Sequence, residues 1–171
     1  PRFQERYKKF TAKADYTAKH VELKELDKYA QDFATVYNSA WAQHGEAKEI
    51  TLEEVKKLFK TMKPIMDERV IWFAYYKTEP IAMFINIPDV NQYFKHFNGK
   101  LNLVNKLRLL WMKKTGQCKK LTGLAFGVVP KYQALGIDSY LIQACGYNMQ
   151  HKGWYDAYEM GWAGDWNPIM V

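Results

Sequence analysis

The sequence predicts an α+β (mixed α/β) fold in which helices flank a mixed sheet, and three observations indicate it. Apolar residues recur at helical spacing in the first third of the chain, a strand pair follows, and a strand–turn–helix–strand order closes it. The 171 residues are 48% hydrophobic and 16% aromatic. That composition excludes intrinsic disorder and fits one packed domain over residues 21–171, preceded by an N-terminal segment, residues 1–20.

The first elements are an edge strand and a helix. Residues 15–23 alternate loosely between polar and apolar side chains, as an edge strand does. Residues 26–41 carry apolar side chains every three to four positions, which predicts a helix that ends near Gly45.

A second helix and a strand hairpin follow. Thr51 and Glu54 form a capping-box pattern, in which each side chain satisfies an amide of the other, and this helix ends at Pro64. Residues 69–76 and 81–87 are rich in β-branched and aromatic side chains and predict an antiparallel hairpin.

The second half of the chain predicts a βαβ unit after one further helix. Residues 103–111 predict a helix broken at Gly116. Residues 121–129 are too continuously apolar for a strand with a wet face, residues 137–151 are helical, and residues 154–162 predict a strand. The last two strands are therefore expected to be parallel.

The net charge of +7 favours polyanionic partners, but it is spread along the chain. Its densest basic stretches are only lysine pairs, at 56–57, 113–114 and 119–120, rather than the runs of roughly five to eight that mark nucleic-acid tails. These pairs predict solvated faces and no nucleic-acid partner.

The two cysteines, Cys118 and Cys145, are too isolated for a disulfide framework or a C-x-x-C site and are expected to be packing residues. No histidine has a partner at metal-ligand spacing, so no metal site is predicted. No apolar run approaches the roughly 20 residues that cross a bilayer. These features predict a cytoplasmic protein without a membrane partner.

Residues 127–139 leave a buried strand and enter a helix, so free amides converge at the positive end of a helix dipole. Gly136 allows the backbone to approach a ligand closely, and the amides from Gln133 to Ser139 suit a pyrophosphate. A simple connecting turn is the alternative interpretation.

The same segment resembles the GNAT superfamily of N-acetyltransferases, in a bacterial branch. Its signature, V-x-P-x-Y-R/Q-x-x-G-x-G/A, is matched by Val128, Pro130, Tyr132, Gln133 and Gly136. The resemblance covers most of residues 20–171 and implies the GNAT acyl-CoA N-acyltransferase fold, with acetyl-CoA as cofactor.

The resemblance also implies which residues hold that cofactor. The backbone of Phe126 and Val128 would pair with the pantetheine arm, and Asn167 would contact the arm near its thiol. The pyrophosphate would lie on the amides of Gln133, Ala134, Leu135, Gly136, Ile137, Asp138 and Ser139. Asp138 stands where the family has Gly or Ala, and the chain is expected to lack the family's C-terminal helix, with its general acid, and the closing strands.

The resemblance implies transfer of an acetyl group from acetyl-CoA to a primary amine of a small molecule or peptide by direct attack. Glu159 is either the base or part of an ion pair. Asp89 and Asn91 either orient the amine or form a turn, and Trp41 either lines the acceptor pocket or packs in the core. The alternative function is a non-catalytic coenzyme A-binding or protein-interaction module of the same fold.

Overall fold

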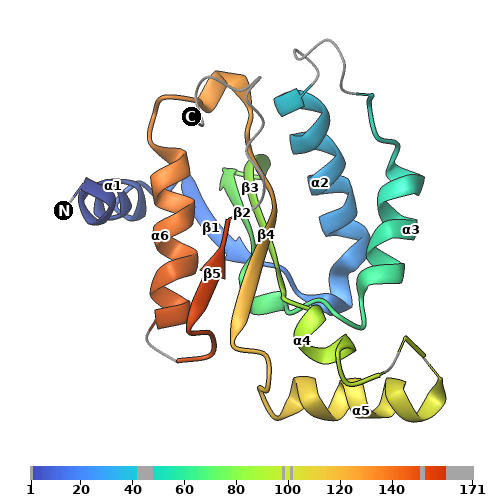
Figure 1. The fold of residues 1–171 in the computed structure, drawn as a ribbon. Coiled ribbons are helices and arrows are strands. Elements are labelled where there is room, and N and C mark those ends of the chain that lie inside the picture. The colour runs from blue at the N-terminus through green and yellow to red at the C-terminus, as the bar shows by residue number, and fades with distance from the viewer. Residues whose placement is uncertain (1, 42–47, 98, 101, 151–152, 161–171) are drawn as a thin grey trace.

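The computed structural model describes residues 2–41, 48–97, 99–100, 102–150 and 153–160. These residues form a sheet with helices on both faces, which confirms the predicted α+β class (Figure 1). In spatial order the strands are β1 (Tyr16–His20), β2 (Ile71–Tyr76), β3 (Glu79–Pro88), β4 (Lys120–Val128) and β5 (Ala157–Glu159). Neighbouring strands are antiparallel except β4 and β5, which form the predicted parallel pair.

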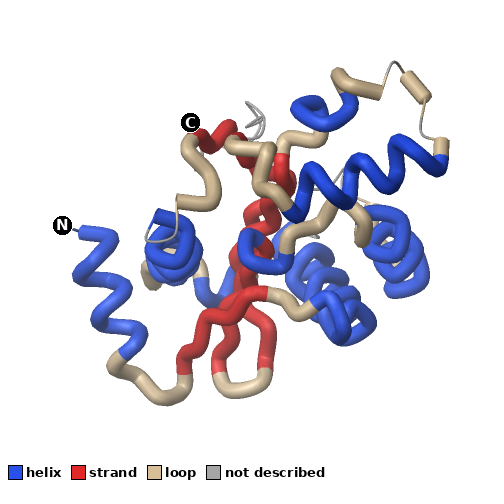
Figure 2. Tube along the Cα trace, turned by 90° about the horizontal axis from the view of Figure 1, so that it is seen from below, coloured by secondary structure: helices blue, strands red, loops and turns tan. Residues whose placement is uncertain are grey.

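Two helical layers cover the sheet. One consists of α2 (Leu26–Trp41) and α3 (Leu52–Met62), and the other of α6 (Ile137–Gln150) with α1 (Arg2–Thr11) beside it (Figure 2). The helices α4 (Asn91–Phe94) and α5 (Leu103–Lys114) lie together at one end of the sheet (Figure 1). Short 3-10 helices are η1 (Leu23–Glu25), η2 (Glu68–Val70) and η3 (Pro130–Tyr132).

The capping box that the sequence predicts is present at the start of α3. The Thr51 hydroxyl accepts a hydrogen bond from the Glu54 N–H, and the Glu54 carboxylate accepts one from the Thr51 N–H at 2.8 Å. The helix over 26–41 is also confirmed, whereas its expected end near Gly45 lies outside the described residues.

Two predicted strand starts are wrong. β2 begins at Ile71 rather than Arg69, because the Asp67 carboxylate caps the preceding turn by accepting from the Arg69 N–H at 3.1 Å. β5 begins at Ala157 rather than Trp154, because the Asp156 and Ala157 amides both donate to the Lys119 carbonyl and so pair irregularly.

Residues 2–20, which the sequence sets apart as an N-terminal segment, contribute to the same core. In α1, the Tyr7 and Phe10 rings lie 5.7 and 5.3 Å from the Tyr140 ring of α6. β1 pairs with β2 over its whole length and is an edge strand, as predicted. α1 therefore lies against α6, the helix that follows the predicted anion-binding turn.

α5 turns an apolar stripe toward solvent. Its inner side contributes Leu109 and Met112 to a small buried cluster that also contains Tyr93, Phe97 and Cys118. The stripe consists of five side chains between 52% and 73% exposed: Leu103, Val104, Leu107, Leu110 and Trp111. An apolar helix face ordinarily marks the buried side, so the outer surface of α5 is unusual.

Replacing Gly127 by Ala is expected to destabilise the fold by about 1–3 kcal/mol. β4 passes so close to α2 that a Cβ atom at Gly127 would lie 2.6 Å from Trp41 Cζ3, so the indole or the strand must move. Urea unfolding of Gly127→Ala, alone and combined with Trp41→Leu, measures this cost. In the Trp41→Leu protein, the smaller side chain should relieve most of the destabilisation caused by Gly127→Ala. If Gly127→Ala costs the same free energy with Trp41 and with Leu at that position, the contact with Trp41 is not its cause.

Candidate functional site

The strand, turn and helix of the predicted motif are present as β4, η3 and α6. In the turn, Ala134 and Gly136 adopt φ of 59° and 92°, so the chain reverses tightly before α6 begins at Ile137. The Gln133 side-chain amide donates to the Val128 carbonyl at 3.0 Å, which ties the turn to the end of β4. The amino end of α6 thus lies beside the end of β4, as an anion site requires.

The residues expected to hold a pyrophosphate differ in exposure. The exposed ones are Gln133, Ala134, Leu135 and Asp138, and the buried ones are Gly136, Ile137 and Ser139. The Asp138 side chain is on the solvent side of the first turn of α6. Its carboxylate therefore need not oppose an anion that approaches the backbone amides.

β4 carries a bulge that the sequence does not predict. Ile85 pairs with Ala125 and Asn86 with Gly123, so Leu124 is the extra residue. In the described residues, β4 pairs with β5 only as far as Thr122. Beyond the bulge, no strand of the described residues pairs with the edge of β4 that faces away from β3, and we call this stretch the open edge.

The expected backbone groups lie on this open edge. The Val129 N–H donates to the Ile81 carbonyl of β3 at 2.9 Å. Because amide directions alternate along a strand, the amides of Phe126 and Val128 point away from β3. The edge therefore fits an extended polar chain that runs along it, which is the geometry a pantetheine arm needs, although Gln133 already occupies the Val128 carbonyl.

Arg6 is a candidate residue that sequence reasoning missed. Its guanidinium donates to the Ser139 hydroxyl at 2.9 Å, and its Cδ would lie 3.0 Å from a Cβ atom at Gly136. α1 therefore places a positive charge at the amino end of α6. No sequence signal joins the two, because they are separated by 133 positions and meet only through the packing of α1 on α6.

The structure brings Asp89 and Glu159 together through Lys120. The Lys120 ammonium lies 2.7 Å from the Glu159 carboxylate and 3.7 Å from that of Asp89. The ion pair with Glu159 raises the pKa of Lys120 above its usual value. Asn91 is exposed, and its N–H donates to the Asp89 carboxylate at 3.1 Å, so these two residues also form a turn.

Trp41 lies elsewhere, at the carboxyl end of β4. Its ring stacks on Tyr37 with centroids 5.0 Å apart and covers Gly127. It therefore packs between α2 and β4, while Asp89 and Glu159 flank the amino end of β4. Asn167 lies outside the described residues.

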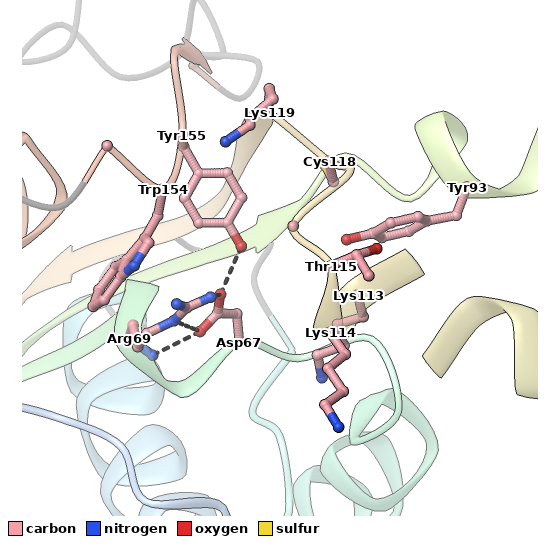
Figure 3. A pocket seen from close by; sticks show the side chains of 12 residues that line it. Asp67, Arg69, Tyr93, Lys113, Lys114, Thr115, Cys118, Lys119, Trp154 and Tyr155 are labelled. Atoms are coloured by element: carbon pink, nitrogen blue, oxygen red, sulfur yellow. Dashed lines mark hydrogen bonds and ion pairs between the residues drawn. The ribbon is translucent and has the colours of Figure 1, made fainter. Parts of the chain in front are cut away.

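A pocket of about 320 Å³ opens beside the amino end of β4 (Figure 3). Its walls include the side chains of Arg69, Lys113, Lys114 and Lys119, with Asp67 as the acidic member. The pocket is thus basic, and it lies at the opposite end of β4 from the turn that follows Val128.

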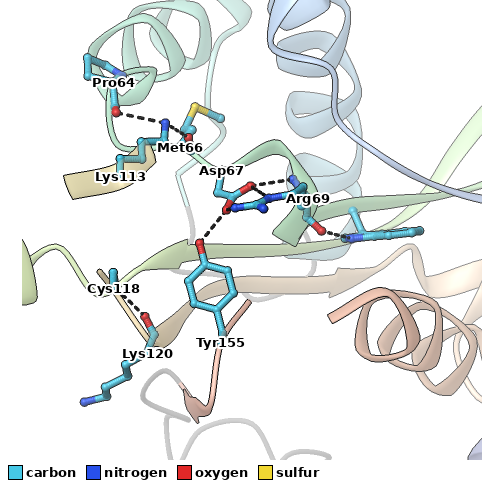
Figure 4. A network of polar contacts seen from close by, with 9 residues as sticks. Pro64, Met66, Asp67, Arg69, Lys113, Cys118, Lys120 and Tyr155 are labelled. Carbon is cyan, nitrogen blue, oxygen red and sulfur yellow. Dashed lines mark hydrogen bonds and ion pairs between the residues drawn. The ribbon is translucent and has the colours of Figure 1, made fainter. Parts of the chain in front are cut away.

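Asp67 is the centre of a polar network on one wall of this pocket (Figure 4). Its carboxylate accepts hydrogen bonds from Arg69 Nε at 2.7 Å and from the Tyr155 hydroxyl at 2.6 Å. The Arg69 guanidinium also lies over the Trp154 ring, 4.0 Å from its centroid. Burial raises the pKa of Asp67, but the hydrogen bonds from Arg69 and Tyr155 outweigh it and hold that pKa below its usual value.

The cysteines are not placed for nucleophilic chemistry. Both are buried, and burial raises the pKa of Cys145 to about 12 and shifts that of Cys118 upward. Among the described residues, no group of His, Cys, Asp and Glu is arranged to hold a metal ion. None of the described helices has the length and apolar character needed to cross a bilayer.

No family model matches the chain. The Caulobacter vibrioides protein named "Bacterial ceramide synthase" is 24% identical over 156 residues, which are 90% of this chain and 41% of that protein. Protein YghO of Escherichia coli K12 is 24% identical over 139 residues, 79% of this chain and 35% of that protein. The chain therefore spans less than half the length of these two curated relatives.

Solved structures show the fold. An aminoglycoside acetyltransferase from a soil metagenomic sample has a TM-score of 0.56 at 10% identity, over 91% of this chain and 82% of that one. A possible acetyltransferase from Clostridium difficile 630 has a TM-score of 0.52 at 14% identity, over 88% of this chain and 81% of that one. A GCN5-related N-acetyltransferase from Sphaerobacter thermophilus has a TM-score of 0.52 at 12% identity, over 84% of this chain and 35% of that one. The chain has the GNAT acetyltransferase fold.

Proposed function

We propose that this chain is an N-acyltransferase that moves an acyl group from a coenzyme A thioester to a primary amine. Acetyl-CoA is the donor that the GNAT signature implies, with a small molecule or peptide as acceptor. A ceramide is the amide of a long-chain amino alcohol, so the name of the Caulobacter relative describes the same bond formation between larger, amphipathic substrates.

The observation that carries the proposal is the open edge of β4 leading into the turn before α6. The edge offers the amides of Phe126 and Val128, and the turn adds the helix dipole and the Arg6 guanidinium. An extended chain ending in a pyrophosphate satisfies all three. The thioester of that chain then lies near the Leu124 bulge, just beyond the last described pair of β4 and β5, and backbone amides there can polarise its carbonyl.

The reaction needs no covalent intermediate on the protein. The amine nitrogen attacks the thioester carbon, the carbon–sulfur bond breaks, the thiolate takes up a proton, and the ammonium proton is lost to a base. Glu159 is opposite Thr122 at the last paired position of β4 and β5, beside the proposed thioester. We assign it the role of base, directly or through water, with Lys120 holding its position.

Thiol release measured with acetyl-CoA and palmitoyl-CoA, each against a panel of short and long-chain amines, tests this function. Amine-dependent release with a matching amide product supports acyl transfer. Binding of either thioester without turnover on any amine favours the non-catalytic module. Absence of both binding and turnover contradicts the proposal.

Glu159→Gln is expected to slow amine-dependent turnover about tenfold without changing the acyl-CoA dissociation constant. The effect is below the usual range for a general base because the carboxylate is 57% exposed and ion-paired, so solvent water can replace it in part. Asp89→Asn is the matched control, since it also removes one carboxylate from Lys120. Equal loss in both variants, with an unchanged KM for the amine, would assign Glu159 a structural role only, whereas a raised KM confined to Asp89→Asn would mean that Asp89 orients the amine.

A further inference from the structure

α5 combines its exposed apolar stripe with a border of cations. At 3.6 residues per turn, Lys106 and Arg108 fall on either side of the stripe formed by Leu103, Val104, Leu107, Leu110 and Trp111. Lys114 lies at its C-terminal end, and the sequence of α5 contains no acidic residue. The outward face is thus amphipathic in cross-section, with an apolar centre and positive edges.

The inner contacts of α5 fix this orientation. Leu109 and Met112 are 5% and 3% exposed in the cluster beneath the helix. The Lys113 ammonium donates to the carbonyls of Pro64, at 3.2 Å, and Met66 (Figure 4). Rotation of α5 to bury its stripe would break both sets of contacts, so the stripe is held toward solvent.

We propose that α5 docks this chain on the surface of an anionic lipid bilayer. The stripe would enter the boundary between headgroups and acyl chains, with Trp111 at its edge, while Lys106, Arg108 and Lys114 meet anionic headgroups. A helix of 12 residues is about 18 Å long and therefore lies along the interface.

A bilayer fits this face better than a protein does. The five residues of the stripe lie along the outward side of a single helix, and none of them lines the pocket beside the amino end of β4. A second copy packed stripe to stripe would bring two all-cationic α5 borders together, in a chain whose net charge is +7. An anionic bilayer complements both features, because its acyl chains can receive the apolar centre and its headgroups can pair with the positive edges.

Docking through α5 would also orient the pocket beside β4. Lys113 and Lys114 belong to the last turn of α5 and line that pocket together with Arg69 and Lys119 (Figure 3). The pocket would then lie near the headgroups. The docking itself does not depend on acyl transfer. Docking would depart from the sequence-based expectation of no membrane partner, which rested on the absence of a bilayer-spanning run and on the diffuse charge.

Sedimentation of the 171-residue chain with phosphatidylcholine vesicles, with and without 30 mol% phosphatidylglycerol, tests the proposal. The anionic vesicles are expected to bind at least about tenfold more strongly. Leu107→Ser combined with Leu110→Ser should reduce binding at least about tenfold to the anionic vesicles. Lys106→Gln combined with Lys114→Gln should remove most of the preference for them.

Matched controls on α3 separate these effects from general charge and hydrophobicity. Lys57→Gln combined with Lys60→Gln makes the same change in net charge, and Leu58→Ser removes another exposed leucine, 41% exposed. Both control variants should bind anionic vesicles like the parent. All the substituted side chains are exposed, so each variant should remain folded. Thermal melting of each variant checks this.

Failure of the parent to bind either vesicle would overturn the docking proposal and leave the acyl-transfer proposal untouched. So would equal binding by the parent and the variant with Leu107 and Leu110 replaced. Parent dimerisation that this variant abolishes, in a parent that ignores vesicles, would assign the face to a second copy instead.

Discussion

Gly136→Trp is expected to weaken acyl-CoA binding at least about a hundredfold. Gly136 has a φ of 92°, which side-chain-bearing residues rarely adopt, and a Cβ atom there would lie 3.0 Å from Arg6 Cδ. An indole at this position would displace Arg6 and fill the space over the amides at the start of α6. Calorimetric titration of parent and variant with acetyl-CoA measures the loss.

Two further variants separate a blocked site from a distorted turn. Gly116→Trp introduces the same bulk at another glycine with positive φ, 65°, where nothing lies within 4 Å of the added Cβ, and it should leave acyl-CoA affinity unchanged. Arg6→Gln keeps the turn intact and removes one charge, so it should weaken binding about tenfold. Full affinity in Gly136→Trp would place the cofactor elsewhere.

The order of helices and strands could be predicted, because the sequence patterns within single segments agree with the contacts that those segments make in the folded chain. The capping box at Thr51 and the helical spacing over 26–41 depend on neighbouring residues alone, and both are present. The parallel pairing of β4 and β5 followed from the strand–turn–helix–strand order. Strand starts were less predictable, because Asp67 and Asp156 redirect the backbone through particular hydrogen bonds.

The outward stripe of α5 could not be predicted in the same way. Periodicity identifies which residues share a helix face, and an apolar face is ordinarily the side that meets the core. In α5 the buried side is set by Leu109 and Met112, which find partners in the α4 region. Five large apolar residues therefore remain in solvent, and only the tertiary structure shows this.

The candidate site was predictable where it is continuous in sequence and not where it is assembled from distant elements. The turn from Gln133 to Ser139 is one segment, so its motif is visible. Arg6 reaches this turn only because α1 packs on α6, and Lys120 joins Asp89 to Glu159 only because β4 lies between β3 and β5. The strand order that creates these contacts is not encoded in any single segment.

Asp67→Asn is expected to lower the free energy of unfolding by about 2 kcal/mol, less than the cost of about 3–5 kcal/mol for a fully buried ion pair, because the Arg69 side chain is 39% exposed and water screens it in part. Asp67 is 6% exposed and accepts hydrogen bonds from Arg69 and Tyr155, which come from different parts of the chain. The amide would leave the Arg69 guanidinium without a countercharge. Urea unfolding at pH 7 measures the change. Glu22→Gln is the control, because its ion pair with Lys24 is as short, 2.7 Å, but both side chains are exposed, so its loss should leave the free energy of unfolding almost unchanged.

The same substitution should change how stability depends on pH. The pKa of Asp67 is below its usual value in the folded chain, so folding favours the ionised form. This contribution is fully present above the unfolded pKa of about 3.9 and disappears as the pH falls through the lower folded value. Asp67→Asn lacks that contribution at every pH, so the difference in unfolding free energy between parent and variant should shrink below about pH 4. A difference that stays constant from pH 7 to pH 3 would mean that the loss comes from packing, and that the charge of Asp67 contributes nothing to the network with Arg69 and Tyr155.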